Sequence, residues 1–320
     1  MIIGYYLMKL IFFASSQFAV PILEALNESD FAPAFVITEP DALAGRHQKP
    51  KATPIKEACE KLAIPFITPE KLKHEEFIKW LKEQNADLAI VCAYGKILPK
   101  EILAIPKFKF INVHPSLLPK YRGPSPIQTV ILDGETETGV TILVVDELVD
   151  HGGIIAKSEI RISKSETYKS LTDILSKLGA ELLIETIPNF ISGKWKPEEQ
   201  DHNQATFTKL IKKEDGHIDW SKSAQEIERM SRAYDPWPGV FAYWQKKLRI
   251  KFLKVSVLNP QVKCAENEIG KTFLTAENKL AVNCGTGIIE IEQLQLEGAK
   301  PMSAQTFLNG HKDFINSKLE

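Results

Sequence analysis

The sequence predicts an α/β fold with a doubly wound, mostly parallel sheet, followed by a smaller C-terminal domain built as a β-barrel. Apolar strand-like runs alternate with amphipathic helical stretches along the first part of the chain, as in a parallel sheet covered on both faces. After a polar, aperiodic stretch come many short strand-like runs, separated by Gly, Asn and Pro. A chain of 320 residues that is 44% hydrophobic exceeds what one core usually holds, so we expect two domains.

The N-terminal segment predicts the first strand and the first helix of this sheet. Residues 9–14 form an apolar run, and an amphipathic helical stripe follows between residues 18 and 26. The apolar run could also belong to a signal peptide, but no basic leader precedes it and the helical pattern continues without a break, so we favour strand, loop and helix. Residues 1–7 would then be an extra leader ahead of Met8. No other stretch is apolar over the length of a transmembrane span.

The rest of the first domain follows the same alternation. The predicted elements are strands at 32–38, 86–94 and 108–113, helices at 53–63 and from Pro124, an antiparallel edge pair at 139–146 and 154–162, and a long helix at 168–191. Strands that are apolar throughout and separated by helices favour βαβ units with parallel pairing. We therefore expect a first domain over residues 1–192.

The second part of the chain begins after a change of composition. Residues 193–208 are polar and charged without periodicity, which predicts a linker. A helix near 223–233 and a series of short strands follow it. Short strands at this spacing favour a small, OB-like β-barrel over residues 209–320.

Charge and cysteine content exclude several classes of protein. The chain has 40 basic and 41 acidic residues and a formal net charge of −1, so no global field draws it to nucleic acid or membrane. Any basic binding site must therefore be local. The four cysteines contain no Cys-x-x-Cys pair, which argues against a zinc knuckle and a disulfide framework. We expect a cytoplasmic, monomeric protein without membrane contact.

Two common kinds of cofactor site are also missing from the pattern. The turn after the first strand, ASSQF, has no Gly-x-Gly-x-x-Gly, so a dinucleotide could not approach the backbone closely there. The seven histidines show no metal-binding spacing such as His-Glu-x-x-His, so we expect no metal.

A strand that ends in two polar residues is the most informative feature of the sequence. In FINVHPSLLPKYRG, residues 110–123, Asn112 and His114 lie two positions apart and project from one side of the strand end. Ligands of open parallel sheets bind beyond the carboxyl ends of the strands. Asp150, in a loop just before two glycines, adds a carboxylate. These groups predict a reactive site, while the alternative is a His that satisfies a buried carbonyl and an Asn that closes a turn.

These residues resemble the core of the formyltransferases that use 10-formyltetrahydrofolate. That family carries an Asn-x-His pair, a Ser-Leu-Leu-Pro turn and an Asp-x-Gly loop. The resemblance implies a Rossmann-like catalytic domain, an enzyme that transfers formyl groups, and 10-formyltetrahydrofolate as the formyl donor. The matching positions are Asn112, His114 and Asp150 as catalytic residues, and Ser116, Leu117, Leu118 and Pro119 as a turn in contact with the folate.

Formyl transfer would use the three catalytic groups in distinct ways. An amine attacks the formyl carbon and creates an oxyanion, and Asn112 and His114 can donate hydrogen bonds to it, each worth about 3–4 kcal/mol in the barrier. Asp150 would support the charge on His114 and help to pass a proton through water towards the leaving nitrogen. For the Ser-Leu-Leu-Pro turn, a plain packing role is the alternative to folate contact.

Three further stretches are similar to the members of this family that formylate methionyl-tRNA. They are residues 39–56, 209–239 and 300–310. The resemblance implies methionyl-initiator tRNA as the partner and a role in translation initiation. The first turn departs from the usual Gly-Thr-Pro, because Ser15, Ser16 and Gln17 stand there.

Two basic segments are candidate tRNA contacts. The connection at residues 40–53 is long for a link between strand and helix, and by resemblance its Arg46 and Lys49 would contact the tRNA. In the second domain a cationic stripe is formed by Lys247, Arg249 and Lys251, on the face opposite to Leu248, Ile250 and Phe252. Such a stripe can track a phosphate backbone, although a mobile loop and an ordinary solvated strand face would have the same sequences.

Two other functions remain open on the sequence. A formyltransferase that acts on a small amine, such as glycinamide ribonucleotide or an amino sugar, would keep the same three groups without an RNA-binding barrel. A folate-binding or RNA-binding protein without activity is the second, and the intact Asn112, His114 and Asp150 argue against it.

Overall fold

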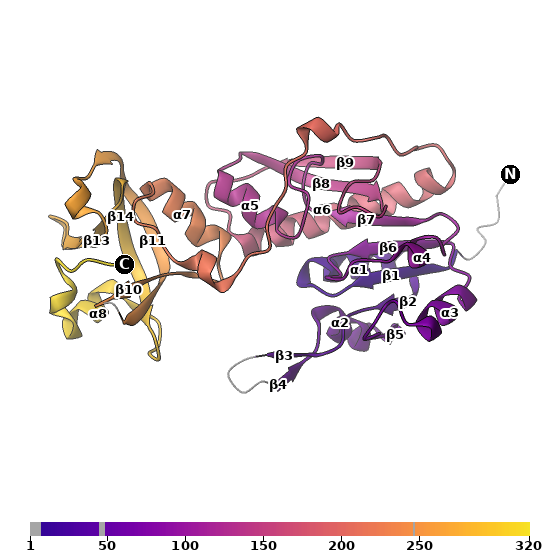
Figure 1. The fold of residues 1–320 in the computed structure, drawn as a ribbon, viewed down its shortest axis with the longest axis horizontal. Coiled ribbons are helices and arrows are strands. Elements are labelled where there is room, and N and C mark those ends of the chain that lie inside the picture. The colour runs from indigo at the N-terminus through magenta and orange to yellow at the C-terminus, as the bar shows by residue number, and fades with distance from the viewer. Residues whose placement is uncertain (1–7, 45–48, 246) are drawn as a thin grey trace. The chain divides into compact units, whose positions relative to one another are not determined.

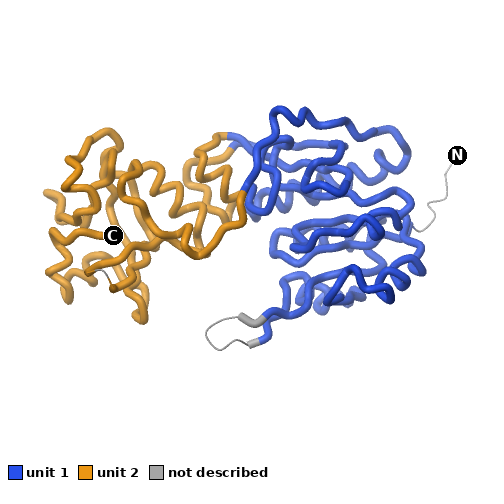
Figure 2. The backbone as a smooth tube through the Cα atoms, in the orientation of Figure 1, with its two compact units in different colours: residues 1–126, 137–161, 172–208 blue, residues 127–136, 162–171, 209–320 orange. Residues whose placement is uncertain are grey.

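The chain forms two compact units in the computed structural model, which describes residues 8–44, 49–245 and 247–320 (Figure 1). The first unit comprises residues 1–126, 137–161 and 172–208, and the second comprises residues 127–136, 162–171 and 209–320, as Figure 2 shows in two colours. Residues 1–7, where a leader is predicted, lie outside the described residues.

A seven-stranded sheet forms the centre of the first unit. Its strands are β1 (Leu10–Ala14), β2 (Pro33–Ile37), β5 (Phe66–Ile67), β6 (Leu88–Cys92), β7 (Phe110–His114), β8 (Glu137–Val144) and β9 (Ile154–Arg161). They lie in the order β5-β2-β1-β6-β7-β8-β9, with parallel pairing up to β7 and antiparallel pairing of β7 with β8 and of β8 with β9. Strands β2 and β5 lie on one side of β1 and strand β6 lies on the other, so the strand order reverses between β1 and β6. The carboxyl ends of these two strands therefore border the kind of crevice in which such sheets bind ligands.

The helices of the first unit follow from local sequence signals. They are α1 (Val20–Asn27), α2 (Pro54–Leu62), α3 (Glu75–Glu83), α4 (Lys100–Leu103) and α6 (Tyr168–Ile191), whose first four residues are counted with the second unit. Helix α5 (Pro126–Asp133) belongs to the second unit except for Pro126. The Thr53 hydroxyl caps α2, accepting from the Lys56 amide at 3.1 Å. On α6, Gly179 lies close to the sheet, because a Cβ there would be 3.0 Å from Val113 of β7.

The connection between β2 and α2 contains a hairpin where the sequence indicates only a long loop. Its strands, β3 (Ala42–Ala44) and β4 (Lys49–Lys51), pair antiparallel. Arg46 lies outside the described residues. Lys49 begins β4, and its side chain is also outside the described part.

The second unit contains an antiparallel sheet and a capped helix. The strands are β10 (Val240–Trp244), β11 (Leu248–Lys263), β12 (Thr272–Leu274), β13 (Leu280–Asn283), β14 (Thr286–Leu296) and β15 (Met302–Ser303), and the helices are α7 (Ala224–Ala233) and α8 (Ala304–Gly310). The order is β10-β11-β14-β13-β12, with β15 on β14. Ser223 and Glu226 form a capping box at the start of α7. The predicted fold class, a mostly parallel α/β domain followed by a small antiparallel β domain, is confirmed.

Candidate active site

The structure brings together the three polar residues that the sequence singles out. Asn112 and His114 lie on β7, and Asp150 lies in the loop between β8 and β9. The Asn112 Nδ2 donates to Asp150 Oδ1 at 3.1 Å, and His114 Nδ1 is 3.5 Å from Asp150 Oδ2. The His114 and Asp150 side chains are only 5% and 11% exposed. An amide, an imidazole and a carboxylate therefore lie in contact at a site from which solvent is largely excluded.

The contacts of His114 fix how its ring is used. Its Nε2 lies 3.0 Å from the Tyr121 carbonyl, which can only accept, so Nε2 carries a hydrogen. Its Nδ1 then faces the Asp150 carboxylate. Both ring nitrogens thus have partners, whereas among the described contacts the second amide hydrogen of Asn112 is not used. Asn112 is therefore the donor that can meet a new oxyanion without giving up a bond.

The backbone on either side of the site holds Asp150 in an unusual conformation. Asp150 has a φ of 50°, in the left-handed region that residues other than glycine rarely adopt. Its Oδ2 accepts from the Gly123 amide at 2.8 Å. Strain of this kind persists only where the surroundings over-determine it, which is typical of functional sites.

A segment that the sequence marks as a linker also belongs to the surroundings of the site. The Arg122 amide donates to the Thr206 carbonyl at 2.9 Å, and the Thr208 amide donates to the Arg122 carbonyl at 2.7 Å. The Tyr121 amide donates to the Thr206 hydroxyl at 2.8 Å. Thr206 and Thr208 therefore hold the turn whose Tyr121 contacts His114 and whose Gly123 contacts Asp150. Sequence reasoning missed them because their polar, aperiodic composition is also that of a solvated connection.

The Ser116–Pro119 turn, predicted to contact folate, is occupied by internal hydrogen bonds. The Leu118 amide donates to the Thr141 hydroxyl at 3.2 Å, and that hydroxyl donates to the Ser116 carbonyl at 2.7 Å. The Lys157 ammonium donates to the Leu118 carbonyl, and burial lowers the pKa of Lys157. Ser116 and Leu118 are buried. These contacts give the turn a structural role beside His114, and a contact with folate stays a prediction.

Removing the Thr141 hydroxyl should therefore destabilise the protein. In Thr141→Val the Leu118 amide and the Ser116 carbonyl lose their partner inside the core, so we expect a loss of about 1–3 kcal/mol in the free energy of unfolding. Urea unfolding measures it. Thr275→Val is the matched control, because the Thr275 hydroxyl accepts from the Lys279 amide in an exposed turn. Equal losses in both variants would contradict the role assigned to Thr141.

The predicted cations of the second unit do not share one environment. Lys247 is exposed and precedes β11, which begins at Leu248. Arg249 lies over the Phe241 ring, with its guanidinium carbon 3.8 Å from the ring centroid. Lys251 is the pairing partner of Phe241 across β10 and β11. Arg249 and Lys251 thus lie on one face of β11, as predicted, and a contact with tRNA stays a prediction for all three.

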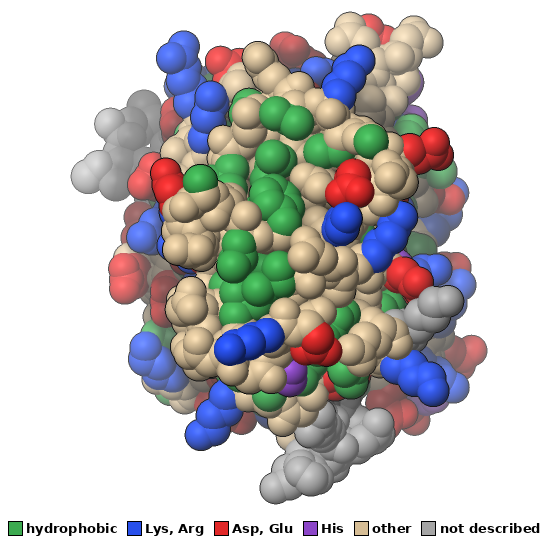
Figure 3. Space-filling view, turned by 90° about the vertical axis from the view of Figure 1, so that its left-hand side faces the viewer, with side chains coloured by type: hydrophobic (Ala, Val, Ile, Leu, Met, Phe, Trp, Pro, Cys, Tyr) green, Lys and Arg blue, Asp and Glu red, His purple; other side chains and the backbone are tan. Residues whose placement is uncertain are grey.

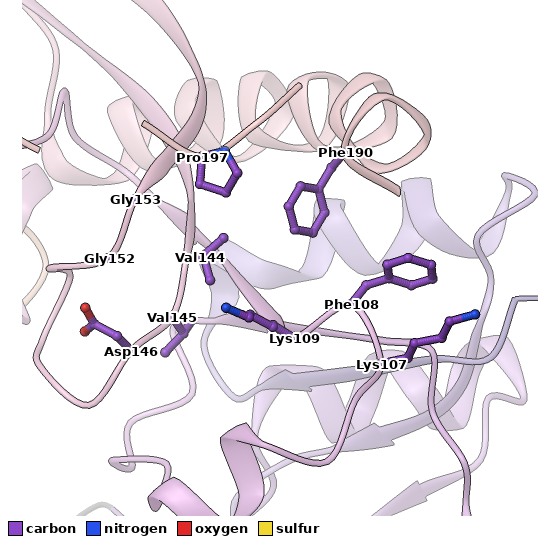
Figure 4. A pocket seen from close by; sticks show the side chains of 10 residues that line it. All are labelled: Lys107, Phe108, Lys109, Val144, Val145, Asp146, Gly152, Gly153, Phe190 and Pro197. Atoms are coloured by element: carbon purple, nitrogen blue, oxygen red, sulfur yellow. The ribbon is translucent and has the colours of Figure 1, made fainter. Parts of the chain in front are cut away.

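A separate pocket of about 510 Å³ lies at the two ends of the Asp150 loop (Figure 4). Asp146, Gly152 and Gly153 line it from the loop, and Phe190 and Pro197 line it from the end of α6 and the segment that follows. The catalytic candidates are not among its lining residues. The loop therefore borders the pocket with its ends and reaches β7 with Asp150.

The described residues contain neither a metal-binding cluster nor a membrane-spanning helix. Within the described ranges, no group of three or more His, Cys, Asp or Glu residues is placed to hold a metal ion. Among the helices of the same ranges, none has both the length and the apolar character to cross a membrane.

Comparison with known proteins gives matches along almost the entire chain. The family described as "Formyl transferase" matches residues 8–187, and "Formyl transferase, C-terminal domain" matches residues 210–312. The methionyl-tRNA formyltransferase of Roseiflexus castenholzii is 41% identical over 304 residues, covering 95% of this chain and 96% of that protein. The enzyme of the same name from Caldanaerobacter subterraneus is 39% identical over 305 residues, covering 95% of this chain and 97% of that protein.

Solved structures share the fold at lower identity. HypX from Aquifex aeolicus in complex with tetrahydrofolic acid superposes with a TM-score of 0.62 at 16% identity, over 97% of this chain and 48% of that one. An N-formyltransferase from Helicobacter canadensis, in complex with folinic acid and dTDP-3-aminofucose, gives a TM-score of 0.61 at 22% identity, over 89% of this chain and 98% of that one. Because two formyl transferase domains match in order and relatives of one name match the full length, the chain belongs to the methionyl-tRNA formyltransferase family.

Proposed function

We propose that this enzyme transfers a formyl group from 10-formyltetrahydrofolate to the α-amino group of methionyl-initiator tRNA, and so supports translation initiation. The observation that carries the chemistry is the buried contact of Asn112, His114 and Asp150 at the carboxyl end of a parallel strand. The full-length likeness to methionyl-tRNA formyltransferases supports the choice of acceptor. The proposal includes a monomeric enzyme in the cytoplasm, where initiation takes place.

The contacts of the three residues support a division of roles in this reaction. The neutral amine attacks the formyl carbon, and the second amide hydrogen of Asn112 donates to the oxyanion that forms. The attacking nitrogen loses its proton to the Asp150 carboxylate, which faces His114 Nδ1 and can share the proton with it. The bond from the formyl carbon to the folate nitrogen then breaks, and that nitrogen takes up the proton held by Asp150 and His114. This transfer restores the Asp150 carboxylate, and tetrahydrofolate leaves as a neutral amine.

Apolar side chains near Asp150 fit a folate ring. Ile97, Leu148 and Val149 are 81%, 60% and 56% exposed, and the last two directly precede Asp150. An ion pair of 2.6 Å between Glu147 and Lys100 joins the loop of Leu148 and Val149 to the start of α4, three residues after Ile97. A flat, largely apolar ring could cover these side chains while its formyl group lies at Asp150. We propose them as folate contacts, together with the predicted Ser116–Pro119 turn.

The acceptor assignment can be tested with the full-length protein. We expect 10-formyltetrahydrofolate to formylate methionyl-tRNA with a far higher kcat/KM than glycinamide ribonucleotide or a nucleotide-linked amino sugar, each assayed separately. The first unit would supply the chemistry in all three reactions. A preference for either small amine would show that the acceptor is wrong while the formyl transfer is right.

For the tRNA, we assign residues 1–192 to catalysis and residues 209–320 to tRNA binding. Residues 193–208 connect the two, and Thr206 and Thr208 of this connection also bond to the turn at Tyr121 and Arg122. The candidate contacts are Arg46, Lys49, Lys247, Arg249 and Lys251. The face drawn in Figure 3 has apolar side chains near its middle, with basic and acidic side chains interspersed around them. Neither sign of charge dominates that face, so it presents no broad positive field to a nucleic acid.

The salt dependence of tRNA affinity tests the cationic stripe. Each phosphate contact releases counterions, so Lys247→Gln and Lys251→Gln should each reduce the slope of log K against log salt by about 1. The loss of affinity should be largest at low salt. Lys312→Gln, a charge removal in a 3-10 turn near the C-terminus, is the control. Slopes equal to that of the unmodified protein in both stripe variants would remove these residues from the interface.

A further inference from the structure

A buried glutamine connects the loop of Asp150 to the turn that contacts His114. Gln200 is 4% exposed and Arg122 is 3% exposed, and their side chains bond to each other. Neither residue is among the predicted catalytic groups. Both lie in the first unit, within reach of the site described above.

On one side, the Gln200 amide nitrogen holds the Asp150 loop. Its Nε2 donates to the Asp150 carbonyl at 2.9 Å and to the Gly152 carbonyl at 2.8 Å. Both amide hydrogens are therefore used on the two carbonyls that flank His151. These bonds act on the backbone of the residue whose φ is 50°. They stabilise that strained conformation, because relaxation of the loop would break the two bonds to the buried amide.

On the other side, the Gln200 amide oxygen accepts from Arg122. The guanidinium donates to Gln200 Oε1 from Nε at 3.2 Å and from Nη2 at 2.6 Å, and Nη2 lies 2.9 Å from His202 Nδ1. An arginine can only donate and a carbonyl can only accept, so the amide has one possible orientation. In the flipped orientation the amide nitrogen would face the Arg122 guanidinium, and the amide oxygen would face the Asp150 and Gly152 carbonyls. The amide is thus locked between a cation and two carbonyls.

Arg122 makes this bridge relevant to the other site residues. Its neighbour Tyr121 accepts from His114 through the carbonyl, and its other neighbour Gly123 donates to the Asp150 carboxylate. Gln200 therefore joins the backbone on which Asp150 is mounted to the turn that orients His114. A shift of either part would change the distance between His114 Nδ1 and Asp150 Oδ2.

We propose that Gln200, held by Arg122, is a positioning residue for formyl transfer, which sets the place of the Asp150 carboxylate against Asn112 and His114. The inference rests on the proposed function, because it assigns Gln200 a role in that reaction. Gln200 acts through Asp150 and has no contact with the reacting atoms in this role.

Gln200→Glu separates positioning from packing. The glutamate has the same shape and keeps an acceptor oxygen for Arg122. It puts a second oxygen opposite the Asp150 and Gly152 carbonyls, in place of the nitrogen that donates to both. The repulsion should push the Asp150 loop away, and a displacement of about 1 Å can lower kcat by about 100-fold. We expect the KM for methionyl-tRNA to stay within about twofold of that of the unmodified enzyme. If Gln200→Glu does not fold, Gln200→Met is measured in its place.

Gln84→Glu is a matched control in the same unit. The Gln84 Oε1 accepts from the Lys9 ammonium at 3.3 Å, and its Nε2 donates to the Trp80 carbonyl at 3.1 Å, so the chemistry of the change is the same. It lies beside the start of β1, where the strand enters the sheet. We expect its kcat to equal that of the unmodified enzyme.

A double-mutant cycle shows whether Gln200 acts through Asp150. In an Asp150→Asn background, Gln200→Glu should lower kcat by less than roughly threefold, because the group that it positions is already gone. A second loss as large as the first would overturn the inference. The imidazole NMR signals of His114, identified with His114→Gln, should also change in Gln200→Glu without substrate and stay unchanged in Gln84→Glu.

These measurements also separate the inference from the proposed function. If the unmodified enzyme does not formylate methionyl-tRNA, the proposed function is wrong, and the His114 signals still test the positioning. If it does, and Gln200→Glu has an unchanged kcat and unchanged His114 signals, the positioning role is wrong and the function stands.

Discussion

His114→Ala is expected to lower kcat by about a thousandfold, which is the size of effect seen when a preorganised polar group is removed from a dry site. The ring is 5% exposed and faces the Asp150 carboxylate, so its removal leaves that carboxylate without a partner for the transferred proton. Asn112→Ala should lower kcat by about 10²–10³-fold, through loss of the oxyanion donor. Effects on KM for the folate should be small, because these interactions strengthen only in the transition state.

Single-turnover formyl transfer to methionyl-tRNA measures the chemical step directly. His74→Ala is a suitable control, because the His74 side chain is 62% exposed and precedes α3. Circular dichroism establishes that each variant is folded. A kcat for folded His114→Ala close to that of the unmodified enzyme would take this residue out of the mechanism.

Gly152→Ala should damage both stability and activity. A Cβ on Gly152 would lie 1.9 Å from the Val144 carbonyl oxygen, and a backbone oxygen at the end of β8 cannot move aside as a side chain can. The Val144 amide also donates to the Gly153 carbonyl at 2.8 Å, so relief of the clash breaks the pairing at this point. We expect a loss of about 2–3 kcal/mol in the free energy of unfolding. Displacement of Asp150, two residues away, should lower kcat by about 100-fold.

Denaturant unfolding and steady-state kinetics on the same preparation measure the two effects. Gly310→Ala, at the end of α8, is the control, because nothing lies within 4 Å of an added Cβ there. Its stability should change by no more than about 0.5 kcal/mol. If Gly152→Ala were as stable and active as Gly310→Ala, the close approach of the loop to β8 would have no consequence.

Local pattern was sufficient to predict every strand of the seven-stranded sheet except the two-residue β5, and to predict the position of the three catalytic candidates. Strand alternation places Asn112 and His114 on one side of β7, and the sheet order brings the Asp150 loop to them. Helix α3 was missed, although Phe77, Ile78 and Leu81 stand at helical spacing among its charged residues. The hairpin of β3 and β4 was missed because its strands are only three residues each.

The surroundings of the site could not be predicted, because they depend on distant pairing. The bond between Arg122 and Gln200 joins residues 78 positions apart. Nothing in the local composition of residues 193–208 distinguishes a segment that packs on the catalytic turn from a solvated connection. A buried glutamine acquires its meaning only from the carbonyls and the guanidinium that meet it in the folded chain.

The late position of Gln200 and Thr206 in the chain has a consequence for synthesis on the ribosome. Chains emerge N-terminus first, so every strand of the larger sheet and all of α6 leave the exit tunnel before residues 198–208 do. A nascent chain at that stage contains Asn112, His114 and Asp150, but Gln200, the partner of the Arg122 side chain, is not yet available. Premature termination at that point would therefore release a fragment that contains all three groups but lacks the hydrogen bonds that set their relative positions.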